Sequence, residues 1–158
     1  MNKLAFYLLL IIFSIAINAY GQQNNLSELL VGEWRNESLK IKINSFNNTD
    51  SIIISESKNV TEWEKNLHIR PIRTFFKPDG TYYSEYRTLG DSIFRKTSGT
   101  WVIEGDSIIM NELQPEKAFF KLHISINNNL AIFQGVIDFD GDGKMDDEYF
   151  GTQRKFSK

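Results

Sequence analysis

The sequence of 158 residues contains no cysteine, and this absence limits how the protein can be stabilised and what chemistry it can perform. No disulfide can cross-link the chain, and neither a thiolate metal site nor a cysteine nucleophile is available. Histidine is also scarce, since His68 and His123 are the only two. We therefore expect the fold to depend on its core, with any metal held by oxygen ligands.

Motifs that carry catalysis are missing as well. The sequence has no Gly-x-Ser-x-Gly, no His-Glu-x-x-His and no glycine-rich phosphate loop. Glu62 and Glu64 flank Trp63 and could be interpreted as a pair of catalytic carboxylates. We instead expect them to be exposed acids in a solvated loop. No basic run rises above the background, so nucleic acid is not a predicted partner. We predict that the protein is not an enzyme.

The first 21 residues have the features of a secretory signal peptide. Lys3 supplies a positive start, residues 4–17 are almost uninterrupted apolar sequence, and Ala19-Tyr20-Gly21 provides a small-x-small cleavage site. The apolar run is shorter than the ~20 residues that a spanning helix needs. We predict cleavage after Gly21 and a single soluble domain over 22–158, periplasmic or secreted. A bacterial lipid anchor would need a cysteine, so no membrane insertion is expected after cleavage.

Beyond residue 31, apolar and polar residues alternate in short segments separated by turns, and this pattern predicts strands. The spacing of eight to twelve residues is typical of an antiparallel sandwich or barrel. Residues 58–70 are harder to interpret, and we predict either a short helix or a loop folded over a barrel mouth, ending before Pro71. Gly99 marks a bulge or a close contact within its strand. We predict an all-β fold of about nine strands: 32–43, 51–56, 72–77, 81–87, 93–104, 107–112, 118–126, 130–137 and 148–156.

Gly32-x-Trp34 follows a predicted helical turn over 25–31 and, together with Arg154 on the last predicted strand, resembles the lipocalin signature. The order of Gly99-Thr100-Trp101, the Asp-Phe-Asp-Gly-Asp-Gly stretch and the final strand is similar to small exported lipocalin-like proteins of Bacteroidetes. The resemblance implies an up-and-down antiparallel barrel of eight to nine strands with a cavity for one small hydrophobic molecule. It also implies that Gly32, Trp34 and Arg154 close one barrel end, with Arg154 stacked over Trp34.

The most specific local feature is an acidic stretch over residues 138–148, where six of eleven residues are acidic and one is basic, in a chain whose net charge is only −2. Its spacing follows a calcium loop, with carboxylates at positions 1, 3 and 5, glycine at 6, a backbone carbonyl at 7 and a further ligand at 9. Position 12 is Tyr149, and the flanks are strand-like, so we predict a calcium-binding hairpin tip rather than an EF-hand. An Asp/Gly-rich turn without metal is the alternative. The predicted ligands are Asp138, Asp140, Asp142, Lys144 through its carbonyl, Asp146, Asp147 and Glu148.

Aromatic residues are abundant, and they could line a ligand cavity or fill a core. Adjacent pairs such as Phe75-Phe76 must point to opposite faces of a strand. The candidate cavity residues are Trp34, Arg73, Phe75, Tyr83, Trp101 and His123, and Arg73, Arg95 or His123 could anchor a carboxylate ligand inside a barrel.

Three functions follow from these features. We predict an exported, lipocalin-like binding protein for a small hydrophobic ligand, with a structural calcium loop. The first alternative is a calcium-stabilised interaction module for a protein or glycan, with a filled core, and the second is a calycin-type barrel enzyme. An apolar cavity of a few hundred Å³ favours ligand carriage over the interaction module.

Overall fold

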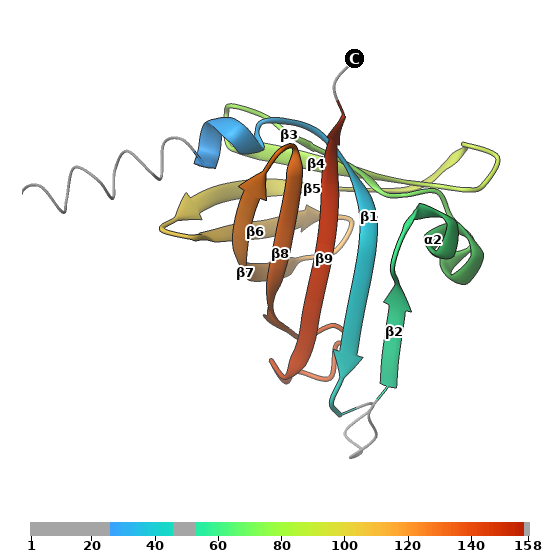
Figure 1. The fold of residues 1–158 in the computed structure, drawn as a ribbon. Coiled ribbons are helices and arrows are strands. Elements are labelled where there is room, and N and C mark those ends of the chain that lie inside the picture. The colour runs from blue at the N-terminus through green and yellow to red at the C-terminus, as the bar shows by residue number, and fades with distance from the viewer. Residues whose placement is uncertain (1–25, 46–52, 157–158) are drawn as a thin grey trace, which may run out of the picture.

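The computed structural model describes residues 26–45 and 53–156, so the predicted signal peptide lies outside the described residues. The described chain forms one antiparallel sheet in which each strand from β3 to β9 pairs with the next, and β9 returns to pair with β1 (Figure 1). This closure gives an eight-stranded barrel with β2 as an additional strand, which confirms the predicted all-β, up-and-down barrel. The strands are β1 (Gly32–Ile43), β2 (Ile53–Ser57), β3 (Arg73–Phe76), β4 (Thr81–Arg87), β5 (Ile93–Glu104), β6 (Ser107–Gln114), β7 (Ala118–Asn127), β8 (Leu130–Ile137) and β9 (Asp147–Phe156).

β1 organises the barrel, because it shares one edge between two partners. Its first part pairs with β3, from Gly32 opposite Phe76 onward, and its second part pairs with β2, from Leu39 opposite Ser57 onward. Its other edge pairs with β9 along most of its length, with a register shift between Asn36 and Ser38. β2 therefore lies beside the closed ring, and the chain must cross from β2 to β3 along the same edge of β1.

The crossing is made by a short helix, α2 (Val60–Leu67), which packs against β1 and β2 (Figure 1). Asn59 caps its start by accepting the backbone N–H of Glu62 at 3.0 Å. His68 ends it in the left-handed region, three residues before Pro71, so the helical alternative for this segment is confirmed. Trp63 is the buried residue of α2.

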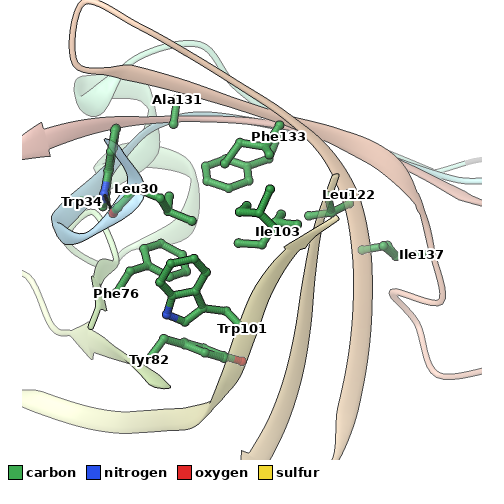
Figure 2. Packing of buried hydrophobic residues seen from close by; sticks show 12 residues of the cluster. Leu30, Trp34, Phe76, Tyr82, Trp101, Ile103, Leu122, Ala131, Phe133 and Ile137 are labelled. Carbon is green, nitrogen blue, oxygen red and sulfur yellow. Dashed lines mark hydrogen bonds between the residues drawn. The ribbon is translucent and has the colours of Figure 1, made fainter. Parts of the chain in front are cut away.

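The barrel interior is tightly packed near the start of β1, where residues 26–30 form a helical turn. Trp34 is fully buried, and its Nε1 donates to the carbonyl of Leu30 at 2.6 Å. Trp101 packs edge-on against Phe76 with 5.6 Å between ring centroids (Figure 2). The Nε1 of Trp101 donates to the carbonyl of Thr81 at 3.0 Å. Both buried indole N–H groups are thus satisfied. We call this region the packed end: Leu30, Trp34, Phe76, Trp101, Ile103, Ile108, Ile124 and Ala131.

The predicted stacking of Arg154 over Trp34 is wrong by one residue. Lys155 is the residue opposite Trp34 in the β1–β9 register, and its Nζ lies 5.4 Å from the centre of the indole ring. Arg154 faces outward and forms two hydrogen bonds with Glu37, at 3.0 and 2.9 Å. Lys155 also donates to the carbonyl of Leu29 at 2.7 Å, and burial lowers the pKa of this lysine. The barrel end is therefore closed by Trp34 and Lys155, which satisfy consecutive carbonyls of the helical turn.

Two glycines support this arrangement through close contacts. A Cβ at Gly99 would lie 2.0 Å from the carbonyl oxygen of Asn111, at the register shift between β5 and β6, so the predicted bulge is confirmed. Gly32 has φ +134°, and a Cβ there would meet the Lys155 side chain at 3.0 Å. Among the residues the structure describes, no helix has the length and apolar character needed to cross a membrane.

Candidate ligand cavity and carboxylate cluster

Buried polar atoms without a hydrogen-bond partner locate the candidate sites. In the described part of the chain, four side-chain atoms are in this state: Trp63 Nε1, Gln153 Oε1, Asp138 Oδ1 and Asp146 Oδ1. Each such atom costs roughly 1–3 kcal/mol unless something pairs with it. The first two belong to residues that line a cavity in the barrel, and the other two belong to the acidic hairpin.

The cavity occupies the barrel interior next to the packed end and has a volume of about 420 Å³. Alternate residues of the strands face it, as the period of two requires. Trp63 and Leu67 of α2 cover it from the side on which the chain crosses from β2 to β3. The lining residues are Asn36, Leu39, Ile41, Trp63, Leu67, Ile69, Ile72, Thr74, Phe76, Tyr82, Ser84, Tyr86, Thr97, Met110, Glu112, Phe120, Leu122, Phe133, Ile137, Phe139, Tyr149 and Gln153.

The lining is mostly apolar, and several of its polar groups bond to one another. Thr74 and Ser84 share a hydrogen bond of 3.0 Å between their hydroxyls. The Tyr82 hydroxyl donates to Glu112 at 3.5 Å, and burial together with the Glu112 charge raises the Tyr82 pKa above its ordinary value. Glu112 is the single charged residue among the lining residues, so no cation of the described residues faces this cavity.

The shape of the cavity depends on Tyr149 and Gly151, which lie two residues apart on the inner face of β9. A Cβ at Gly151 would lie 2.7 Å from the Tyr149 hydroxyl and 3.1 Å from the ring carbon that carries it. The missing side chain at Gly151 thus makes room for the Tyr149 ring. Burial raises the pKa of Tyr149 to about 12.

Several predicted cavity residues do not line the cavity, because the sequence did not indicate which face of their strand points inward. Phe75 and Tyr83 lie on the outer face, stacked with 4.5 Å between centroids, while Phe76 and Tyr82 face inward. His123 also faces outward, 3.2 Å from Asp106. Trp34 and Trp101 are interior, as predicted, but they belong to the packed end and do not line the cavity.

Arg73 also lies outside the barrel, in a surface depression of about 540 Å³ lined by several arginines. Each of these arginines has an acidic partner within 3.1 Å, so their charges are already matched. Arg73 was predicted to anchor a carboxylate inside the barrel. Because it lies outside the barrel, it does not provide this anchor. The pairs are Arg35–Glu33, Arg70–Glu64, Arg73–Asp91 and Arg154–Glu37.

The acidic stretch forms the connection between β8 and β9, where Ile137 pairs with Asp147, so it is a hairpin tip as predicted. Asp147 is completely buried and organises the tip. Its Oδ2 accepts the backbone N–H of Phe139 at 2.7 Å, and its Oδ1 accepts that of Asn44 at 3.3 Å. One carboxylate thus connects the hairpin to the end of β1.

Three carboxylates converge at this tip and could hold a metal ion. Asp138, Asp140 and Asp147 each offer an oxygen, and these oxygens lie within 4.8 Å of one another. Asp138 Oδ2 accepts the backbone N–H of Gly143 at 3.0 Å, whereas its Oδ1 is buried and unpartnered. A hard cation that binds carboxylate oxygens would satisfy this atom and reduce the repulsion among the three acids.

Asp142 and Asp146 of the hairpin tip both contact Ser45, a buried residue just after β1. The Ser45 hydroxyl contacts Asp142 Oδ2 at 3.2 Å and Asp146 Oδ2 at 3.0 Å. Lys144 places its Nζ 3.5 Å from Asp142, and the Lys144 backbone N–H holds the pKa of Asp142 below its usual value. Asp146 Oδ1 remains buried without a partner. The carbonyl contribution of Lys144 stays a prediction.

Glu148 was also predicted as a ligand, but the structure does not bring it to the three converging carboxylates. Glu148 follows Asp147 on β9 and therefore points to the opposite, outer face. It pairs there with Lys42 at 2.7 Å, and this contact lowers the Glu148 pKa.

Sequence reasoning missed Trp63, Gln153 and Ser45. Trp63 lies in a segment without strand periodicity, and Gln153 is a polar residue facing the interior of a strand. Ser45 lies far from the acidic stretch in sequence and reaches it only because β1 pairs with β9. Chain closure, which no local pattern encodes, brings these residues to their sites.

No protein-family model matches this chain, and no curated protein matches it either.

Proposed function

We propose that this protein is an exported, lipocalin-like binding protein that holds one small, largely apolar molecule inside its barrel. The observation that carries the proposal is the apolar cavity of about 420 Å³ between the packed end and α2. A volume of a few hundred Å³ is in the range of small-molecule sites. Export is supported by the signal-like sequence over 1–21, and the lipocalin resemblance by Gly32-x-Trp34 at the closed barrel end.

The cavity also favours this function over the interaction module. If the barrel were filled, outward aromatic residues such as Phe75 and Tyr83 would be the candidates for contact with a protein or glycan partner. The described outer pair is already engaged, since Lys96 Nζ lies 4.2 Å from the Tyr83 ring centre and the two rings stack on each other. Binding rather than catalysis is proposed because the single carboxylate of the lining, Glu112, is bonded to the Tyr82 hydroxyl, and the lining residues include no histidine or lysine.

Binding can be tested with N-phenyl-1-naphthylamine, an uncharged fluorophore whose emission increases in apolar surroundings. Saturable enhancement at one site per molecule, lost on substitution of Leu122 by Trp, is the expected result, because the larger ring would fill the cavity. The matched control is Val102→Trp, which places the same ring on the outer face of β5, where Val102 is 47% exposed. Absence of saturable binding by the wild-type protein contradicts the proposal.

The second part of the proposal is that the hairpin tip binds calcium. Its support is the oxygen-only donor set of Asp138, Asp140 and Asp147 and the unpartnered buried oxygens of Asp138 and Asp146. Exported calcium modules often have dissociation constants on the order of 10⁻⁴–10⁻³ M. The ion would order the hairpin and fix the start of β9 against β1.

Millimolar calcium is therefore expected to raise the melting temperature. Asp138→Asn should abolish the rise, because it removes the charge at the convergent site. Glu148→Gln serves as the matched control and should retain the rise, since Glu148 faces away and pairs with Lys42. Equal loss in both variants, or no effect of calcium on the wild type, contradicts a specific calcium site.

A further inference from the structure

The cavity has a polar wall as well as an apolar one. Trp63 Nε1 is a donor and Gln153 Oε1 is an acceptor, and both atoms are buried without partners. Trp63 is 1% exposed, so water outside the protein does not satisfy it. Both residues line the same cavity, so an unsatisfied donor and an unsatisfied acceptor there would be complementary to a single ligand group that both accepts and donates.

The two residues belong to two elements, α2 and β9, that both contact β1. Gln153 of β9 lies opposite Asn36 of β1 in the strand register. Trp63 belongs to α2, which packs against β1, and Asn36, Trp63 and Gln153 all line the cavity. The polar wall is therefore on the β1 side, whereas Glu112 and Tyr82 come from β6 and β4 and are already bonded to each other.

The charges around the cavity restrict the ligand further. A carboxylate ligand needs a cation or several donors to compensate for its desolvation. No lysine, arginine or histidine is among the lining residues, and Glu112 would repel an anion. An ammonium ligand would leave Trp63 unpaired, since an ammonium has no acceptor. A hydroxyl or a primary amide meets both requirements without a charge.

We propose that the ligand, if the binding function proposed above holds, is an uncharged amphipathic molecule whose hydroxyl or amide head accepts from Trp63 Nε1 and donates to Gln153 Oε1. Its apolar body lies against the remaining lining, which includes Phe120, Leu122 and Phe133. The proposal assigns head-group selectivity to two residues from different elements, and the apolar lining provides affinity without that selectivity.

The test uses four ligands with the same twelve-carbon chain: dodecan-1-ol, its methyl ether, dodecanoate and dodecylamine. Each is titrated against wild-type protein loaded with N-phenyl-1-naphthylamine, and displacement gives its affinity. Dodecan-1-ol should bind most tightly. The methyl ether accepts but cannot donate, so we expect about fivefold weaker binding, and for dodecanoate a loss of tenfold or more.

Variants locate the head group. Trp63→Phe and Gln153→Leu should each weaken dodecan-1-ol about fivefold, the loss of one net hydrogen bond. Gln153→Leu should leave the methyl ether unchanged, because that ligand has no proton to donate. Trp101→Phe is the matched control: it removes an indole whose Nε1 already bonds to Thr81 and which does not line the cavity, so dodecan-1-ol affinity should be unaffected. Melting curves verify that each variant is folded.

The outcomes separate this inference from the binding function. If dodecanoate or dodecylamine binds as tightly as the alcohol, or if Trp63→Phe and Gln153→Leu bind it like the wild type, the head-group assignment is overturned while binding itself stands. If the fluorophore binds nowhere and no ligand of the series binds, the proposed function fails and the head-group assignment fails with it.

Discussion

The packed end and the cavity share several strands, but they differ in whether the indole N–H of a buried tryptophan has a hydrogen-bond acceptor. At the packed end, Trp34 and Trp101 donate their indole N–H groups to carbonyls at 2.6 and 3.0 Å. At the cavity, Trp63 is as deeply buried but has no partner. Satisfied polar groups stabilise a core, whereas an unsatisfied one is a cost that a ligand can remove. The contrast separates the packed end from the cavity, where we propose that a ligand binds.

The largest expected effect tests this contrast with the same substitution in both regions. Trp34→Phe should lower the free energy of unfolding by about 2–3 kcal/mol, because it leaves the Leu30 carbonyl without its donor and removes buried ring atoms. Trp63→Phe should lower it by about 1 kcal/mol less, because both variants lose buried ring atoms but only Trp34 loses a donor that was bonded. Urea denaturation measures both. Equal destabilisation by the two variants would break the distinction between the regions.

A smaller effect is expected where the cavity wall depends on a missing side chain. Gly151→Ala places a methyl group 2.7 Å from the Tyr149 hydroxyl and must displace that ring. We expect a loss of about 1–2 kcal/mol in unfolding free energy and weaker fluorophore binding. Gly90→Ala is the control, because its nearest atom would be 3.8 Å away in an exposed turn, and it should leave both quantities unchanged. Unaltered binding in Gly151→Ala would show that Tyr149 does not shape the cavity.

The smallest effect is a pH dependence confined to alkaline solution. Burial raises the pKa of Tyr149 to about 12, whereas an unfolded chain titrates its tyrosines near pH 10. The folded state therefore retains a proton that the unfolded state releases, so this stabilisation is complete below pH 10 and is lost as the pH rises towards 12. Urea midpoints between pH 8 and 11.5 should fall less steeply for Tyr149→Phe than for the wild type. Identical slopes would indicate that this tyrosine is not buried from solvent.

Strand spacing predicted an antiparallel sandwich or barrel, and the family resemblance implied the barrel, but neither indicated which side of each strand faces inward. Phe75-Phe76 and Tyr82-Tyr83 are equally apolar pairs, so the inner member of each was decided by pairing with distant strands. The same limitation explains the error of one residue at Arg154 and Lys155. In the acidic stretch, the loop spacing predicted Asp138, Asp140, Asp142 and Asp146 as ligands, whereas the three carboxylates that converge are Asp138, Asp140 and Asp147. It could not exclude Glu148, whose direction is set by strand alternation after the tip.

Trp63 shows a second limit. Its segment has no strand pattern, and the sequence predicted either a helix or a loop there. That α2 covers the cavity follows from the way β2 and β3 share one edge of β1, a feature of the closed sheet. Trp34 and Trp101, which have the clearest sequence signals, lie at the packed end, whereas the residues that line the cavity had weaker signals.

The most direct measurement is a titration of ¹⁵N-labelled protein with dodecan-1-ol, observed at the three indole N–H signals expected from three tryptophans. The Trp63 signal should move downfield and saturate with the ligand, because its N–H gains an acceptor, while the Trp34 and Trp101 signals should stay in place because their N–H groups are already bonded. Saturable binding that leaves Trp63 unmoved, or that shifts all three signals alike, would contradict the division of the barrel into a packed end and a ligand cavity.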